Sequence, residues 1–495
     1  IIEKVIAEHK QVIVLIPEIA LTFQTVSRFY RRFGERVSVM HSRLSQGEKF
    51  DQFERAKAGE IDIMIGPRSA LFTPFEHLGL IVIDEEHETS YQSEMPPKYH
   101  AREVAVHRAS MVGASVILGS ATPSLESYYR AQKGRYTLFT LTKRAGGASL
   151  PKVWVTDLRE ELERKNRSIF GGKLMELMQD RLAKKEQIIL FLNRRGYAGS
   201  VSCRKCGEVI KCPHCSVSMT AHMHYGRLEH LVCHYCGYQA TMPALCPKCR
   251  SRYIGTFGIG TQKVEQLVRE RFPQARVLRM DADTTTGKEG HEKILRDFAA
   301  GSADILIGTQ MIVKGHDFPN VTLVGILAAD LSLNVGDFRA AERTYQLLAQ
   351  AAGRAGRGEK PGDVVLQTYQ PEHYSIVSAA KQDYLGFYEQ ELIQRQILHY
   401  PPVSNILGVL VLSEQRGHAQ ELADRLAEQM RRYEQVVILG PAPASLSKAK
   451  DVYRYVIYAK CADYRILRQI KNGLEQYMKA QETYRDCRLQ FDFNF

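Results

Sequence analysis

Short apolar runs separated by amphipathic stretches occupy the first 125 residues of the chain. The runs are QVIVLI (11–16), RVSVMH (36–41), IDIMIG (61–66), GLIVID (79–84) and ASVILGS (114–120). Between them, stretches such as GEKFDQFERAKAG have the apolar spacing of helices. Strands that alternate with helices predict a parallel sheet, so this region is expected to be an α/β lobe.

A second series of the same kind begins at QIILFLN (187–193) and resumes after a cysteine-rich segment. Its later runs are ARVLRMD (275–281), ADILIGT (303–309), VTLVGILAAD (321–330) and GDVVLQTY (362–369). Residues 126–180 are less regular and contain KRAGGASLPK, which we interpret as a linker. The pattern therefore predicts two parallel-sheet lobes, of which the second is interrupted by the cysteines.

The pattern changes after LHYPPV (398–403), where the order of elements becomes strand, helix, strand, strand, helix, strand. This order predicts a C-terminal α+β domain of ferredoxin-like type. The expected division is a first lobe (1–140), a linker with the start of the second lobe (141–200), a zinc-binding insertion (201–252), the rest of the second lobe (253–390) and the C-terminal domain (391–495).

The net charge of the chain indicates which class of molecule it binds. The 495 residues carry a formal net charge of +12, with 44% apolar and 25% charged residues. The positive balance favours nucleic acid as a partner, although a merely soluble basic protein has the same composition. No apolar run is long enough to span a bilayer, and the N-terminus lacks the features of a signal peptide. We expect a cytoplasmic protein without a membrane partner.

Eight of the ten cysteines form four C-x-x-C pairs within residues 203–249. The 17 residues between the second and third pairs match the spacing of a zinc ribbon. We therefore predict two Zn²⁺ sites in a nested arrangement, with disulfides or free thiols as the alternative. The outer site has Cys203, Cys206, Cys246 and Cys249 as ligands, and the inner site has Cys212, Cys215, Cys233 and Cys236. Five histidines could substitute as ligands: His214, His222, His224, His230 and His234.

Candidate nucleotide chemistry begins with IVIDEEH (81–87), where Asp84 and Glu85 directly follow an apolar strand. Carboxylates at this position can hold Mg²⁺ on a triphosphate and prime a water, but strand-end acids also cap helices. Arg354 and Arg357 in QAAGRAGR are three residues apart, which predicts one helix face; they could meet a phosphate or simply face solvent. The phosphate-binding motif G-x-x-x-x-G-K-[ST] does not occur in the 495 residues.

Several blocks in a fixed order resemble superfamily 2 helicases, and most specifically the primosomal protein N′ (PriA) family of replication-restart DNA helicases. The carriers are VLIPEIALT, HSRLSQGEK, GPRSALF, IVIDEEHETSYQSEMPPKYHAREVA, GSATPSLES, LFLNRRGYA, the cysteine segment, GTQMIVKGHDFPNV and QAAGRAGR. The resemblance implies two RecA-like lobes and ATP-driven 3′→5′ unwinding of DNA at stalled forks and D-loops. It also implies a bacterial cytoplasmic protein whose partners are single-stranded DNA, single-stranded DNA-binding protein, primosome proteins and the loader of the replicative helicase.

The same resemblance assigns roles to individual residues. Asp84 would orient Mg²⁺, Glu85 would act as the base for water, and His87 would couple this site to neighbouring motifs. The second lobe would contact ATP through Gly315, Gln350, Arg354 and Arg357. The expected DNA-binding residues are Arg68, Tyr91, Lys98, Tyr99, Arg102, Thr309 and Lys314. Among them Tyr91 and Tyr99 suit base stacking and Lys98 and Arg102 suit phosphates, whereas the alternative is a surface loop without function. The zinc segment would separate strands and bind partners.

One departure from the family pattern is the missing phosphate-binding motif. Family members carry this motif, a DNA-binding domain and a winged-helix domain ahead of the position of Ile1. We therefore expect the chain to be a fragment that does not hydrolyse ATP by itself. The alternative is a non-catalytic zinc-containing DNA-binding scaffold of the primosome, although the retained acids and arginines favour truncation. An RNA helicase is disfavoured because the nested zinc insertion belongs to the DNA family.

Overall fold

The computed structural model describes residues 1–17, 21, 23–42, 44–141, 150–192, 200–224, 227–256, 260–281, 284, 290–309, 312, 318–356 and 360–494. The chain divides into two compact units, the first formed by residues 1–137 and the second by residues 138–313 and 317–495. This division falls near the predicted boundary at residue 140. Among the described helices, none combines the length and the apolar character needed to cross a bilayer.

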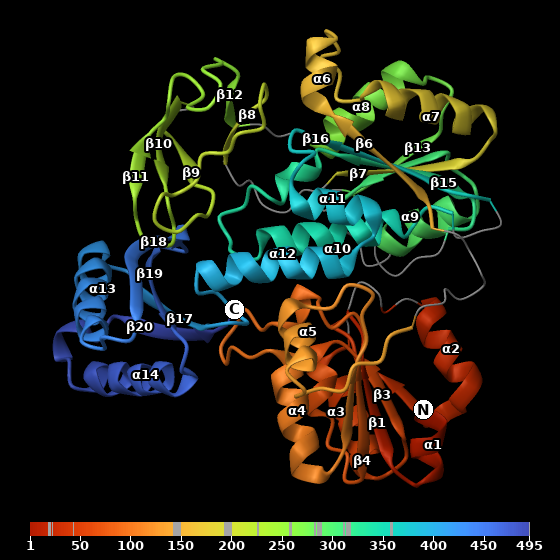
Figure 1. The fold of residues 1–495 in the computed structure, drawn as a ribbon. Coiled ribbons are helices and arrows are strands. Elements are labelled where there is room, and N and C mark those ends of the chain that lie inside the picture. The colour runs from red at the N-terminus through yellow and green to blue at the C-terminus, as the bar shows by residue number, and fades with distance from the viewer. Residues whose placement is uncertain are drawn as a thin grey trace. The chain divides into compact units, whose positions relative to one another are not determined.

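The first unit is built on a parallel sheet of five strands in the order β2-β3-β1-β4-β5. The strands are β1 (Gln11–Leu15), β2 (Val37–Val39), β3 (Ile63–Gly66), β4 (Leu78–Ile83) and β5 (Ser115–Leu118). Its helices are α1 (Ile2–Ala7), α2 (Phe23–Phe33), α3 (Gln46–Lys57), α4 (Ala101–Val112) and α5 (Leu125–Gln132) (Figure 1). Every residue of β1 is buried, as expected for a central parallel strand with an uninterrupted apolar run. The predicted first lobe is confirmed.

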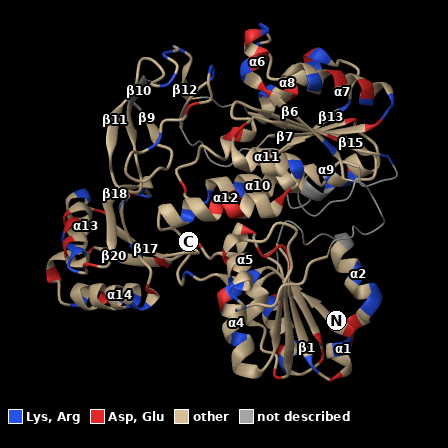
Figure 2. Ribbon diagram, in the orientation of Figure 1, with Lys and Arg blue, Asp and Glu red and all other residues tan. Residues whose placement is uncertain are grey.

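The second unit contains a parallel sheet of six strands in the order β13-β14-β7-β15-β16-β6. The strands are β6 (Lys152–Asp157), β7 (Gln187–Leu192), β13 (Val277–Met280), β14 (Ile305–Gly308), β15 (Val321–Leu327) and β16 (Asp363–Thr368). Its helices are α6 (Leu158–Glu163), α7 (Gly172–Ala183), α8 (Thr261–Arg271), α9 (Gly290–Ala299), α10 (Ala340–Ala352), α11 (Tyr374–Lys381) and α12 (Tyr384–Ile397). Figure 2 shows charged residues mainly on the helices and few on the strands of both parallel sheets. The six-stranded parallel sheet and its helices confirm the predicted second RecA-like lobe.

The edge strand β6 was not predicted, because it lies in the segment interpreted as irregular. It pairs in parallel with β16 over its whole length. Its burial is partial, since Lys152 and Val155 are exposed and Val153 and Trp154 are half-buried. An edge strand covered on part of its surface needs no continuous apolar run, so the hydrophobic pattern did not reveal it.

The cysteine-rich segment leaves the second lobe after β7 and returns before α8. It forms an antiparallel sheet of β9 (Thr220–His224), β10 (Arg227–Val232) and β11 (Gln239–Thr241). A separate antiparallel pair joins β8 (Val201–Cys203) to β12 (Ile254–Thr256) at the two ends of the segment. This pair brings the entry and exit of the insertion together.

The C-terminal domain has the predicted ferredoxin-like order of elements. These are β17 (Asn405–Ser413), α13 (Arg416–Arg431), β18 (Val437–Ala449), β19 (Val452–Cys461), α14 (Tyr464–Lys479) and β20 (Arg488–Phe493). The four strands form an antiparallel sheet in the order β18-β19-β17-β20. Buried residues of both helices and of the central strands form one apolar core.

One glycine allows the zinc segment to pack closely against the second lobe. Gly207 has a left-handed backbone (φ 75°), and a Cβ atom at this position would overlap the carbonyl oxygen of Tyr369, just after β16. Only glycine combines this conformation with so close an approach of two backbones.

We predict that Gly207→Ala lowers the free energy of unfolding about 1–3 kcal/mol more than Gly301→Ala does, as measured by chemical denaturation. Gly301 is a matched control, because it lies in the same unit with φ 77° and a Cβ atom there would meet no atom within 4 Å. Both variants bear the cost of a left-handed alanine, but only Gly207→Ala must displace a backbone. Equal losses for the two variants would contradict the packing role of Gly207.

Candidate nucleotide and zinc sites

The acidic segment lies where three parallel strands end at the same edge of the first sheet. The amide of Asp84, directly after β4, donates to the Leu15 carbonyl at the end of β1 (2.9 Å). The amide of Gly119, directly after β5, donates to the Ile83 carbonyl (2.8 Å). Ligands of open α/β sheets bind at this edge, so the fold places the predicted acids where nucleotide chemistry is expected.

Asp84 and Glu85 present carboxylates at this edge. Asp84 is exposed, and one of its carboxylate oxygens accepts a hydrogen bond from the Glu85 amide (3.0 Å). Partial desolvation raises the pKa of the Asp84 carboxyl above its ordinary value. Glu85 is half-buried and has a left-handed backbone (φ 48°), which turns the chain sharply after the strand. Such a conformation in a non-glycine residue persists only where the surrounding structure holds it, and it is common at functional sites.

Glu86 is the structural centre of the segment, a role that its place in the motif did not reveal. Its side chain is 1% exposed and accepts hydrogen bonds from Arg102 (3.1 Å), the Ser124 amide (2.6 Å), the Ser124 hydroxyl (3.0 Å) and the Ser127 hydroxyl (2.8 Å). Ser124 caps α5, and Ser127 lies in its first turn. One carboxylate therefore joins the acidic loop to α4 and to the start of α5. The spacing of Ser124 and Ser127 at a helix start was the available sequence signal.

His87 connects the acidic loop to the loop after β5. Its Nδ1 atom lies 2.7 Å from the Ser120 hydroxyl in GSATPS, and 3.6 Å from a carboxylate oxygen of Glu85. The Ser120 hydroxyl also accepts a hydrogen bond from the Thr122 amide (2.9 Å). The structure thus brings together Glu85, His87 and the GSATPS loop.

Tyr91 does not fit the predicted role in base stacking. Its side chain is 1% exposed and belongs to the apolar core of the first unit. Its hydroxyl lies within hydrogen-bonding distance of two carbonyl oxygens, those of Asp84 (2.7 Å) and Leu15 (3.0 Å). The ring has no free face for a base, so Tyr91 supports the acidic loop from within.

Arg102 likewise does not fit the predicted contact with DNA phosphate. It is 6% exposed, and its guanidinium is engaged by Glu86, Glu103, Ser124 and Ser127. Burial alone would lower the pKa of Arg102, but the neighbouring carboxylates raise it. The cation is needed inside the unit because a buried carboxylate without a partner is costly.

Tyr99 remains a candidate for DNA contact. Residues 92–100 form a loop that is closed by a bridge between Gln92 and His100 and by a hydrogen bond from the Ser93 amide to the Tyr99 carbonyl (2.8 Å). The half-buried Tyr99 ring packs edge-on against Phe72, which is 52% exposed (5.6 Å between centroids). This aromatic pair reaches the surface, whereas Tyr91 is buried.

Lys98 and Arg68 are the other two residues of this region that are predicted to contact DNA. Lys98 is half-buried near the tip of the loop. Arg68, two residues after the end of β3, donates to the carbonyls of Ser90 (3.3 Å) and Gln92. Arg68 therefore anchors the start of the loop, in addition to any contact with DNA.

In the second unit, Thr309 follows β14, and Gln350 lies in the last turn of α10. The prediction that Arg354 lies on a helix face with Arg357 is wrong for Arg354, because α10 ends at Ala352. Gly356, in a left-handed conformation, donates its amide to the Val321 carbonyl (3.1 Å), which turns the chain back to β15. Lys314, Gly315 and Arg357 lie outside the described residues.

The eight clustered thiols form the two predicted nested sets. Cys203, Cys206, Cys246 and Cys249 form the outer set, and Cys212, Cys215, Cys233 and Cys236 form the inner set. Within each set the sulfur atoms lie within 4.8 Å of one another, and the pairs Cys203–Cys249, Cys206–Cys246 and Cys212–Cys236 are 3.5–3.6 Å apart. Tetrahedral zinc with Zn–S bonds of about 2.3 Å needs sulfur atoms about 3.8 Å apart, so both sets fit Zn²⁺. No histidine whose side chain is described belongs to either set. The side chain of His224 is not among those described.

Each of the four C-x-x-C pairs has the same backbone turn. The residue four positions after the first cysteine donates its amide to that cysteine's carbonyl, at 2.8–3.0 Å. The four donors all have a left-handed backbone: Gly207, Ser216, Gly237 and Arg250. Two of them are not glycine, so the turn is imposed by the loop that presents the thiols and not by the residue type.

Four family models match successive parts of the chain. They are the DEAD/DEAH box helicase (residues 1–131), the PriA DNA helicase Cys-rich region domain (212–240), the helicase conserved C-terminal domain (251–359) and the primosomal protein N C-terminal domain (396–494). Their order agrees with the two lobes, the zinc segment and the C-terminal domain of the structure.

Curated relatives match the chain over most of its length. The chain is 48% identical to replication restart protein PriA of Bacillus subtilis (strain 168), over 100% of the chain and 61% of that protein. It is 44% identical to PriA of Synechocystis, over 92% of the chain and 56% of the relative. It is 38% identical to PriA of Treponema pallidum (strain Nichols), over 97% of the chain and 72% of the relative. The chain thus spans 61% and 56% of the lengths of the first two relatives.

We predict that Arg102→Met lowers the free energy of unfolding of the first unit by about 3–5 kcal/mol, because Glu86 is left buried without its cation. The matched control is Arg32→Met, which breaks an ion pair with Glu3 in the same unit (2.7 Å) whose side chains are 64% and 59% exposed. That loss should stay below about 1 kcal/mol. Urea denaturation followed by circular dichroism measures both. Similar losses would show that the buried pair does not organise the unit.

We also predict that the chain binds two Zn²⁺ ions, one in each thiol set. Cys212→Ser should impair the inner site and leave the outer one able to bind, because the two sets share no ligand. Elemental analysis of the purified chain should give two zinc ions for the wild type and fewer for the variant. One zinc ion in the wild type would contradict the nested arrangement.

Proposed function

This chain belongs to the PriA family of replication restart proteins, and from that membership we propose that it is the motor of an ATP-dependent DNA helicase moving 3′→5′. The substrates proposed are single-stranded DNA, stalled forks and D-loops. After unwinding, the protein would start primosome assembly and the reloading of the replicative helicase. Single-stranded DNA-binding protein, primosome proteins and the helicase loader are the proposed partners.

The arrangement around Glu86 supports this proposal most directly. Asp84 and Glu85 offer carboxylates at the ligand-binding edge of a parallel sheet, and Glu86 and His87 fasten the same segment to the loop after β5. A motor must transmit the state of its nucleotide to neighbouring loops, which such shared contacts allow. A carboxylate site without these contacts would serve equally well as a plain metal or capping site.

In the proposed mechanism, Asp84 would hold Mg²⁺, which would offset charge on the phosphates, and Glu85 would accept a proton from the attacking water. Gly315, Gln350, Arg354 and Arg357 of the second lobe contribute to the nucleotide site, and the arginines stabilise charge on the transferred phosphoryl group. The nucleotide and Mg²⁺ would also need the backbone amides and lysine of a phosphate-binding motif, which does not occur in the 495 residues. We therefore propose that the chain alone does not hydrolyse ATP.

We propose that Tyr99 and Phe72 form the base-contacting surface of the first unit. Arg68, Lys98, Thr309 and Lys314 are proposed to contact the phosphate backbone. The loop that carries Tyr99 is joined to the acidic segment through residues 88–92, where the Tyr91 hydroxyl contacts the Asp84 carbonyl. A base on Tyr99 could thereby shift the acidic segment without touching it.

The second candidate is a non-catalytic zinc-containing DNA-binding scaffold. The observation in its favour is the absence of a phosphate-binding motif from the 495 residues. The two candidate functions predict different ATP hydrolysis for a longer version of the chain that carries G-x-x-x-x-G-K-[ST] ahead of Ile1. The helicase hydrolyses ATP in response to single-stranded DNA and loses this activity in Glu85→Gln, whereas the scaffold shows no hydrolysis in either form.

We predict that Tyr99→Ala in that longer version reduces both the affinity for single-stranded DNA and the hydrolysis that DNA stimulates. The loss of one stacked base should weaken binding about 5- to 150-fold, equivalent to about 1–3 kcal/mol. The salt dependence of binding should stay the same, because the phosphate contacts remain. Fluorescence anisotropy and a phosphate-release assay provide the measurements.

The matched control for this test is Tyr30→Ala, a tyrosine on α2 of the same unit that is 43% exposed. It should leave both DNA binding and hydrolysis unchanged. If Tyr99→Ala behaves like Tyr30→Ala, the loop does not contact DNA bases.

A further inference from the structure

The inner thiol set lies at a junction of three parts of the second unit. Cys212, Cys215 and Cys233 share one apolar cluster with Phe338 of the second lobe and Tyr400, which precedes β17. The outer thiols do not belong to this cluster, and two of them, Cys206 and Cys249, are only half-buried. The inner set is therefore placed to affect how the parts of this unit are held together.

The segment of the inner set that follows Cys233 contacts the C-terminal domain directly. The Tyr235 ring stacks on Tyr458 of β19 with 4.7 Å between centroids. The Nδ1 atom of His234 lies 3.0 Å from the Pro443 carbonyl oxygen in β18. A shift of this segment would therefore disturb the docking of the C-terminal sheet.

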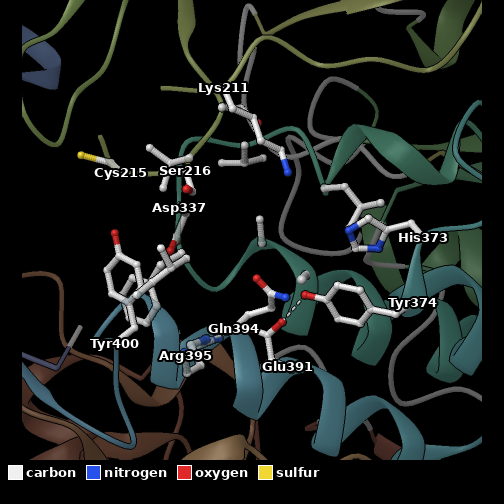
Figure 3. Close-up of a pocket in the computed structure, with 18 residues that line it drawn as sticks. Lys211, Cys215, Ser216, Asp337, His373, Tyr374, Glu391, Gln394, Arg395 and Tyr400 are labelled. Atoms are coloured by element: carbon white, nitrogen blue, oxygen red, sulfur yellow. Dashed lines mark hydrogen bonds and ion pairs between the residues drawn. The ribbon is translucent and has the colours of Figure 1, made fainter. Parts of the chain in front are cut away.

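Tyr400 carries a polar atom that the surrounding protein does not use. Its side chain is 1% exposed, and its hydroxyl has no hydrogen-bond partner among the described residues. Tyr400 and Cys215 line the same cavity of about 160 Å³, and Figure 3 shows the hydroxyl directed to the side on which Cys215 lies. A buried hydroxyl without an acceptor is unfavourable, so a nearby thiolate would be a favourable acceptor.

Lys460 of β19 is a buried cation next to the same tyrosine. It is 7% exposed, and its Nζ atom lies 3.4 Å from the centroid of the Tyr400 ring. The hydrogen bond that the ammonium makes among the described residues goes to the Leu398 carbonyl (3.1 Å), and no carboxylate there pairs with it. Buried lysines are rare unless a negative charge balances them.

The missing negative charge is available in the inner thiol set. Four thiolates around Zn²⁺ carry a formal charge of −2, which a buried site must balance by hydrogen bonds and nearby cations. We propose that Tyr400 and Lys460 form an outer shell of the inner zinc site: once zinc is bound there, the Tyr400 hydroxyl donates to a ligand thiolate and Lys460 offsets the negative charge. Because Lys460 belongs to the C-terminal domain, zinc in the inner site holds that domain to the zinc segment.

The test measures zinc affinity in the full chain by competition with a chromophoric chelator. In a Cys249→Ser background, which removes an outer ligand, the measurement reports the inner site. There Tyr400→Phe and Lys460→Met should each weaken zinc binding about 10- to 100-fold. Lys460→Arg should retain most of the affinity because it keeps the cation. In a Cys236→Ser background, which reports the outer site, the same variants should have no effect.

Tyr484→Phe is the matched control, because Tyr484 is also a buried tyrosine but belongs to the core of the C-terminal domain. It should leave both sites unchanged. Tyr400→Phe removes only an oxygen atom without a protein partner, so it should fold even if Lys460→Met does not, and it then decides the question alone. Without a role toward the thiolates, this change would be neutral or stabilising.

A second readout follows the junction itself. Removal of zinc from the wild type should accelerate amide hydrogen exchange at the start of β17 and in residues 233–237. The proposal is overturned if Tyr400→Phe binds inner zinc with wild-type affinity, if it weakens both sites equally, or if zinc removal leaves exchange in these segments unchanged.

Discussion

A buried carboxylate, that of Glu86, organises the functional edge of the first unit. Removing a carboxylate from water is costly, and the cost is met here by Arg102 and by donors from Ser124 and Ser127. All of these partners lie on elements that follow the acidic strand, so the carboxylate cannot be satisfied unless β5, α4 and α5 are in place. The position of Asp84 and Glu85 therefore depends on the completed unit and not on the strand alone.

The second unit has a comparable constraint in its thiols. Each set needs four sulfur atoms from two distant turns, and completing the outer set requires the two ends of the insertion to come together. The inner set is enclosed by residues of the second lobe and the C-terminal domain, and the outer set is more exposed. In both units, polar groups that require exact partners determine geometry that apolar packing alone leaves adjustable.

The hydrophobic pattern predicted the two sheets because strands buried on both faces need continuous apolar runs, as β1 and β7 show. It did not predict β6, whose partial burial leaves no such run. The nested thiol sets were predictable because zinc fixes the spacing of its ligands. The role of Glu86 was not, since the identity of its partners depends on three-dimensional packing. Tyr91 shows the same limit: an aromatic residue in a polar loop can be a surface group or a core group, and only its surroundings decide.

The shared contacts of Glu86 and His87 predict that the acidic segment and the loop after β5 behave as one cooperative body. Native-state amide hydrogen exchange tests it directly at two positions, the Glu86 amide bonded to the Gly119 carbonyl (3.0 Å) and the Ser124 amide bonded to the Glu86 carboxylate (2.6 Å). One body predicts that the two amides exchange through the same opening, with equal free energies and equal dependence on denaturant. Exchange of Ser124 through a much easier opening than Glu86 would show that the two segments move independently, and would contradict the account.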